Sequence, residues 1–167
     1  EERSLASLTA IYNNLALCYM KSGSLEKAEE YIRKLEAECE AHFEEMDYIS
    51  VNCMRARYCH LCGNISMRDR YIADIQNQLS GDVLILDLFD DLYDFCELML
   101  EIDRGDVCRN IGEKLKALVE QTGIANMQRK MTALEMDYVK KTKDRERYLK
   151  TAGRFYELTE IVEQENR

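Results

Sequence analysis

The amino-acid sequence predicts an all-α fold, built as a right-handed array of about four antiparallel helical hairpins. The 167 residues include no proline and only seven glycines, so the chain lacks the frequent turn residues that all-β sandwiches and barrels need. Hydrophobic residues make up 46% and charged residues 33% of the chain, which suits helices with one buried and one solvated face. Apolar residues also recur at intervals of three and four, as amphipathic helices require.

Residues 5–39 predict the first hairpin most clearly. The apolar series that follows one helix face is Leu5, Leu8, Tyr12, Leu15 and Tyr19. Gly23 interrupts this series, and the same spacing resumes with Leu25, Ala28, Ile32, Leu35 and Cys39. Because a single hairpin cannot bury both faces, we expect further hairpins to cover it. Arrays of this kind mostly bind and transmit rather than catalyse.

The breaks between predicted helices recur about every forty residues. Gly63 follows Gly23 by about 40 residues, Gly105 comes about 42 residues later, and a polar break at Lys143 and Asp144 follows after about 38 more. If each break is the turn inside a hairpin, one domain spanning 1–167 contains the pairs 3–44, 46–80, 82–122 and 123–167. This division predicts eight helices of about 15 to 20 residues each.

The first hairpin combines bulky apolar residues with two alanines at helix-contact spacing. The residues of this pattern are Tyr12, Leu15, Ala16, Tyr19, Gly23, Ala28 and Ile32, and it resembles a tetratricopeptide repeat. Ala16 and Ala28 are the small residues that allow the two helices to approach closely. Leu35 stands where the family usually has alanine, and the family's terminal proline is absent. The resemblance covers about a fifth of the chain and implies a tetratricopeptide-like α-solenoid.

The C-terminal residues 133–167 carry a second pattern. The segments F-Y-E-L-T and E-Q-E-N-R stand out in it, and the run is similar to the last hairpin of the helical-repeat regions that precede the catalytic domain in bacterial GGDEF-type diguanylate cyclases. One helix stripe contains Tyr148, Ala152, Phe155, Leu158 and Val162, and no glycine or proline closes it before Arg167. The resemblance implies that this helix connects to an output domain after Arg167. The GGDEF signature itself is absent, so we expect any cyclase activity outside residues 1–167.

Net charge and cysteine content limit the function classes. With 32 acidic and 23 basic residues the formal charge is −9, so nucleic acid is not an expected partner. The most apolar stretch, residues 83–100, contains four aspartates, and we expect no membrane insertion. The seven cysteines are odd in number and lack the spacing of a disulfide scaffold, which favours a reducing, cytoplasmic compartment. The chain has no signal segment and does not begin with methionine, so we expect it to be part of a longer protein.

One group of cysteines resembles a metal site. Cys59 and Cys62 are three residues apart on a predicted helix, and Cys53 precedes them by one and a half turns. A structural zinc site needs further ligands, and Cys53 or His42 would have to supply them. The alternative is that these thiols pack between helices. Because a single C-x-x-C is a weak signal, we predict no metal and no cofactor, with Cys53, Cys59 and Cys62 as the candidate ligands.

Two charged clusters are candidates for partner contacts. An acidic stripe along a helix predicted from Leu84 to Ile102 is interpreted as a solvated face rather than a docking face; its members are Asp87, Asp90, Asp91, Asp94, Glu97 and Glu101. A basic patch near the last turn consists of Lys140, Lys141, Lys143, Arg145, Arg147 and Lys150. From this patch we select Lys140, Lys141, Arg145 and Arg147, together with Asn13 and Asn14 on the first helix, as candidate partner-binding residues.

No catalytic motif or phosphate-binding loop is present in the sequence, so we predict a protein without catalytic activity of its own. The leading hypothesis is a sensory or scaffolding repeat region that binds a protein, peptide or small molecule and regulates a C-terminal diguanylate cyclase. The alternative is a free-standing repeat protein that binds peptides, as a regulator or adaptor. Either form is compatible with a homodimer through the C-terminal helix.

Overall fold

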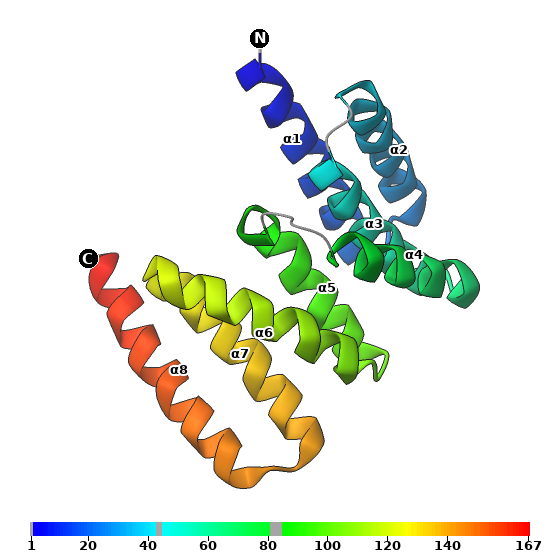
Figure 1. Cartoon of the computed structure of the whole chain (residues 1–167). Coiled ribbons are helices and arrows are strands. Elements are labelled where there is room, and N and C mark those ends of the chain that lie inside the picture. The colour runs from blue at the N-terminus through cyan, green and yellow to red at the C-terminus, as the bar shows by residue number, and fades with distance from the viewer. Residues whose placement is uncertain (1, 43–44, 81–84) are drawn as a thin grey trace. The chain divides into compact units, whose positions relative to one another are not determined.

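The structure, a computed structural model, describes residues 2–42, 45–80 and 85–167, and this part of the chain is all-α (Figure 1). It contains eight α-helices and one short 3₁₀ turn, with no strand in the described ranges. The helices are α1 (Glu2–Lys21), α2 (Leu25–His42), α3 (Glu45–Leu61), α4 (Ile65–Gln78), α5 (Phe89–Glu101), α6 (Gly105–Thr122), α7 (Ala125–Thr142) and α8 (Arg145–Glu165); the 3₁₀ turn η1 is Ile85–Leu88. The prediction of an all-helical chain is therefore confirmed.

The turns inside the four hairpins recur at equal intervals along the chain. A residue in the left-handed region occupies each turn: Gly23 (φ 77°), Gly63 (φ 73°), Asp103 (φ 61°) and Lys143 (φ 59°). In the first three turns the next residue donates its backbone N–H to the carbonyl five positions earlier, at N···O distances of 2.9, 2.8 and 2.7 Å. This hydrogen bond is characteristic of a Schellman motif, which satisfies carbonyls at a helix end and reverses the chain.

The third turn differs from the prediction that placed Gly105 in it. Asp103 takes the left-handed conformation there, which aspartate tolerates better than most residues, and Gly105 is the first residue of α6. A Cβ atom on Gly105 would lie 3.4 Å from Cε2 of Tyr138, so the missing side chain allows Tyr138 of α7 to approach α6 closely. The glycine therefore serves helix packing, and the turn residue itself keeps the same repeat interval as the other three.

The chain divides into two compact units, Glu1–Leu84 and Ile85–Arg167. In the first unit, α1 pairs with α2, α3 pairs with α4, and α2 also packs against α3. Its core contains Ala16, Met20, Ala28, Ile32, Leu35, Cys39, Val51 and Met54. Ala16 and Ala28 are fully buried, which agrees with their predicted place where small residues are needed between helices.

In the second unit, α5 pairs with α6, α7 pairs with α8, and α7 packs against both α5 and α6. The predicted helix over the acidic stripe is shorter than expected: η1 precedes it as a 3₁₀ turn and α5 begins at Phe89, while Leu84 lies outside the described residues. Such 3₁₀ turns are common at helix N-termini. Most of the apolar residues of α5 are buried, whereas Asp90 and Glu101 are exposed. None of the described helices is both long enough and apolar enough to cross a membrane.

Each unit has an ion pair at the same two positions of the repeat, but the acidic and the basic residue are exchanged between the units. In the first unit, Arg55 of α3 binds Glu36 of α2 through two hydrogen bonds of 2.6 Å each. In the second unit, Glu135 of α7 binds Lys116 of α6 at 3.0 Å. Glu135 lies two repeat intervals after Arg55, and Lys116 lies two repeat intervals after Glu36. Equivalent positions of the repeat therefore connect successive hairpins in both units, with the acid and the base exchanged.

Candidate functional site

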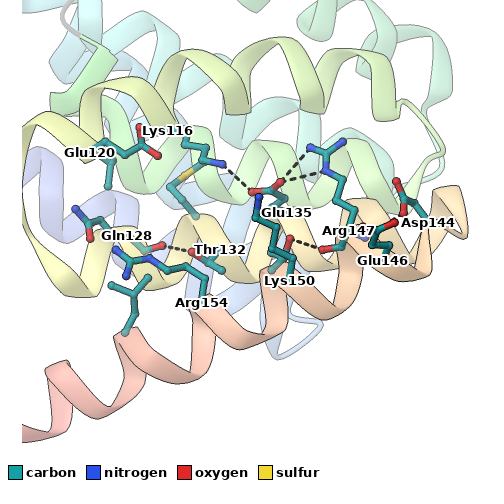
Figure 2. Close-up of a pocket in the computed structure, with 14 residues that line it drawn as sticks. Lys116, Glu120, Gln128, Thr132, Glu135, Asp144, Glu146, Arg147, Lys150 and Arg154 are labelled. Atoms are coloured by element: carbon teal, nitrogen blue, oxygen red, sulfur yellow. Dashed lines mark hydrogen bonds and ion pairs between the residues drawn. The ribbon is translucent and has the colours of Figure 1, made fainter.

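A groove of about 670 Å³ lies on the second unit, between α6 and α8 and over α7 (Figure 2). Its volume falls in the range of pockets that hold small molecules or peptide side chains. The residues that line it are Lys116, Val119, Glu120, Gln128, Met131, Thr132, Glu135, Asp144, Glu146, Arg147, Lys150, Thr151, Arg154 and Leu158. Three consecutive helices thus supply its walls.

The base of the groove is apolar and its sides are polar. Val119, Met131 and Leu158 contribute apolar side chains and belong to the buried residues of the unit. Thr132 and Thr151 direct their hydroxyl groups to helix carbonyls, each at 2.8 Å, so these hydroxyls are already satisfied within α7 and α8. The charged residues are therefore the main polar groups available to a ligand.

Glu135 lies in the middle of the groove and is bound by a cation from each side. Lys116 Nζ of α6 lies 3.0 Å from Glu135 Oε2, and Arg147 Nη2 of α8 lies 3.0 Å from Glu135 Oε1 (Figure 2). Burial alone would raise the pKa of the Glu135 carboxyl, but hydrogen bonds and the charges of Lys116 and Arg147 outweigh it and lower this pKa. Glu135 is consequently an anion at neutral pH and joins all three helices.

The N-terminus of α8 fixes the position of the cations along the groove. Asp144 caps the helix, because its carboxylate accepts a hydrogen bond of 3.0 Å from the backbone N–H of Arg147. Arg147, Lys150 and Arg154 then follow at intervals of three and four, which places them along one side of a helix. All three side chains point from α8 toward α7 in Figure 2.

These cations differ in how they are paired. Arg147 is bound to Glu135, and Arg154 forms an exposed ion pair of 3.3 Å with Glu157 on its own helix. The Lys150 side chain forms no hydrogen bond or ion pair with any residue that the structure describes. Exposed pairs within one helix contribute little free energy. Lys150 and Arg154 are thus available to a negatively charged ligand.

A smaller recess of about 100 Å³ adjoins the groove between α6 and α7. The two share Lys116, Met131, Glu135 and Arg147, and the recess adds Cys108, Leu134 and Tyr138. Gly112 lines it too, and a Cβ atom there would have no heavy atom within 4 Å. The missing side chain therefore leaves space beside the ion-paired Glu135.

The structure separates the basic residues that the sequence placed in one patch. Arg147 and Lys150 line the groove, whereas Lys140 pairs with Asp137 at 3.6 Å and lies over the Tyr148 ring. Lys141 binds the Asp103 carboxylate at 2.8 Å and also donates to the Leu100 carbonyl. Lys141 therefore ties α7 to the α5–α6 turn. Arg145 is exposed at the first position of α8 and does not line the groove.

The two predicted asparagines lie on α1 in the first unit. Asn14 is exposed, but Asn13 is half-buried and its Oδ1 atom is shielded from solvent. Asn14 is therefore the more accessible of the two side chains.

The candidate metal-ligand cysteines do not share one environment. Cys53 and Cys59 are buried in α3, while Cys62 is exposed and lies after the end of that helix at Leu61. Burial raises the pKa of the Cys59 thiol, which disfavours the thiolate that a metal requires. Among the residues searched, which are those the structure describes, no group of three or more His, Cys, Asp or Glu is placed to hold a metal ion. The His42 side chain lies outside the described residues.

Lys116, Glu135 and Arg154 were not predicted from the sequence, because they lie on three different helices and meet only when these helices pack. The equivalence of Glu135 to Arg55 and of Lys116 to Glu36, each two repeat intervals apart, is a signal that could have identified two of them. A scan of protein-family models finds no match to the chain, and a search of curated proteins finds no relative.

Proposed function

We propose that this chain is a non-catalytic interaction module whose second unit binds a partner in the groove between α6 and α8. The observation that carries the proposal is the groove itself, which combines an apolar base with charged sides and a volume of about 670 Å³. Helical hairpins that present such a surface typically recognise peptides or protein segments.

The fuller form of the proposal is a tetratricopeptide-like α-solenoid. The equal spacing of the left-handed turn residues supports it, because a constant interval is typical of repeated hairpins. The resemblance of the first hairpin to a tetratricopeptide repeat supports the same arrangement, with the buried Ala16 and Ala28 at their expected places.

We further propose that the module regulates a C-terminal signalling domain, a diguanylate cyclase. The residues that resemble the hairpin before GGDEF domains, 133–167, belong to α7 and α8. These helices also supply Glu135, Arg147 and Lys150 to the groove. A ligand there would contact the connecting helix directly, so binding would favour one position of α8 over another and pass that change to the output domain.

The coding sequence that follows Arg167 in the parent gene tests this regulatory form first. A cyclase domain after Arg167 is the expected result, and the fused protein should change its rate of cyclic di-GMP synthesis when Lys150 is replaced by glutamate. A stop codon soon after Arg167, or an unrelated domain, would overturn the cyclase connection and leave the free-standing peptide-binding module as the proposal.

A homodimer through α8 is part of the same proposal. Leu149 and Tyr156 are 61% and 65% exposed, although both are large and apolar, and they are seven residues apart on α8. Sedimentation velocity of the wild type and of Leu149→Glu tests it. We expect the wild type to dimerise as its concentration rises and Leu149→Glu to remain monomeric. A wild type that is monomeric at all concentrations would contradict the dimer.

A further inference from the structure

We infer that the groove between α6 and α8 is a docking site for an acidic peptide segment of a partner protein. The inference rests on the proposed function and assigns a ligand class to the same groove. It rests on the cations of α8, on the carboxylate already bound in the groove, and on the size of the groove.

Along the groove, α8 carries more cations than α4 carries at the equivalent positions of the repeat. The positions of α4 that lie two repeat intervals before Arg147, Lys150 and Arg154 hold Met67, Arg70 and Asp74. Both units consist of two hairpins. At these three positions, however, α4 has one cation and one acid, whereas α8 has three cations. The groove lining as a whole holds four acidic and four basic residues, and two of the acids are already engaged, Glu135 by two cations and Asp144 as the helix cap. The row on α8 therefore concentrates positive charge on one side of the groove.

Glu135 shows that a carboxylate is well accommodated between α6 and α8. Its two oxygens lie 3.0 Å from Lys116 Nζ and from Arg147 Nη2, at distances normal for charged hydrogen bonds. Lys150 follows Arg147 by about one turn of α8, and Arg154 follows Lys150 by another. A second carboxylate, from a ligand, would reach Lys150 and Arg154 without displacing Glu135.

The size of the groove, about 670 Å³, favours a peptide over a small inorganic anion. Met131 and Leu158 lie in the lining beside the cations, and both belong to the buried residues of the unit. A peptide that fills the groove above these buried residues would exclude water from the new ion pairs. Such exclusion strengthens charge interactions and favours acidic side chains over neutral ones.

Fluorescence anisotropy with synthetic peptides tests the inference. The probes are fluorescein-labelled peptides of eight residues in which glutamate alternates with leucine and alanine, and matched peptides with glutamine in place of glutamate. We expect the glutamate peptides to bind the wild-type chain, and Lys150→Glu and Arg154→Glu to weaken this binding by about tenfold or more each. Arg145→Glu is the matched control, since it makes the same charge change on the same helix outside the groove, and binding should stay within about twofold.

A peptide of opposite charge distinguishes a specific loss of binding from misfolding of the variants. A lysine version of the peptide should bind Lys150→Glu with Arg154→Glu more tightly than it binds the wild type, and a misfolded protein would not show that gain. Equal binding of the glutamine peptides, or equal loss in Arg145→Glu, would overturn the inference. So would equal competition by a single-stranded oligonucleotide, because that would indicate a general polyanion surface.

The result also separates this inference from the proposed function. If a random peptide display library yields binders that are not acidic, or that ignore Lys150 and Arg154, the acidic ligand class is wrong and the interaction module stands. If neither the library peptides nor the glutamate peptides bind, the acidic ligand class and the proposed interaction module are both contradicted.

Discussion

Replacement of Arg55 by methionine tests whether the ion pairs between hairpins stabilise the first unit. The Arg55 side chain is 12% exposed and makes three hydrogen bonds of 2.6–2.7 Å to the carboxylates of Glu29 and Glu36. Methionine retains much of the side-chain length, but it removes the Arg55 cation from Glu36 and leaves Glu29 with the exposed Arg33 alone. Removing one partner of a buried pair is costly, but these carboxylates are 22% and 31% exposed and regain water. We therefore expect a loss of about 2–3 kcal/mol in the free energy of unfolding.

Urea titrations followed by circular dichroism measure this loss, with Arg33→Met as the matched control. Arg33 also binds Glu29, at 2.9 Å, but it is 73% exposed, so its removal should cost less than about 0.5 kcal/mol. Combining Arg55→Met with Glu29→Gln and Glu36→Gln should recover part of the loss, because neither carboxylate then remains without Arg55, and the exposed Arg33 tolerates the loss of Glu29. Equal losses in Arg55→Met and Arg33→Met would refute the reasoning, as would a loss below about 1 kcal/mol.

Three further predictions concern titration, thiols and glycines. The pKa of Glu135 is lowered, so its carboxylate stabilises the fold above the ordinary glutamate pKa of 4.5, and this stabilisation is lost as the pH falls below that value. The urea midpoint of the wild type should therefore fall between about pH 5 and pH 3, and that of Glu135→Gln should fall less. Cys18 and Cys62 are exposed, so an aromatic disulfide reagent should modify them in the native protein and reach the five buried cysteines only after unfolding; rapid reaction of all seven would contradict the burial. Gly112→Ala should stabilise α6 by about 0.5–1 kcal/mol, whereas Gly23→Ala should destabilise its turn by about 1 kcal/mol, because only Gly23 needs a positive φ; urea titration decides the signs.

Local sequence signals predicted the hairpins well. Gly23, Gly63 and the Lys143-Asp144 break do lie in turns between helices, because left-handed residues and polar caps act within a few positions of the chain. Gly105 misled the prediction, since a glycine can serve a close packing contact as well as a turn, and only the Tyr138 ring distinguishes the two.

The groove could not be predicted from local signals. Lys116, Glu135 and Arg147 come from three helices, so their meeting depends on how α6, α7 and α8 pack. The basic cluster around the last turn is divided for the same reason. Lys141 ends α7 and contacts Asp103, whereas Arg147 begins α8 after the turn and contacts Glu135.

The exchanged signs of the two inter-hairpin ion pairs also discriminate between neighbours during assembly. If the hairpin α7–α8 added to α2 in place of α3–α4, Glu135 would stand opposite Glu36, and in the reverse exchange Arg55 would stand opposite Lys116. Each misplaced hairpin would therefore meet a like charge where the native one meets an opposite charge. The four hairpins place a left-handed turn residue at the same position of the repeat, so charge is one feature that distinguishes them during folding or between two copies of a chain. The exchanged charges therefore favour the native order of the hairpins over these two exchanges.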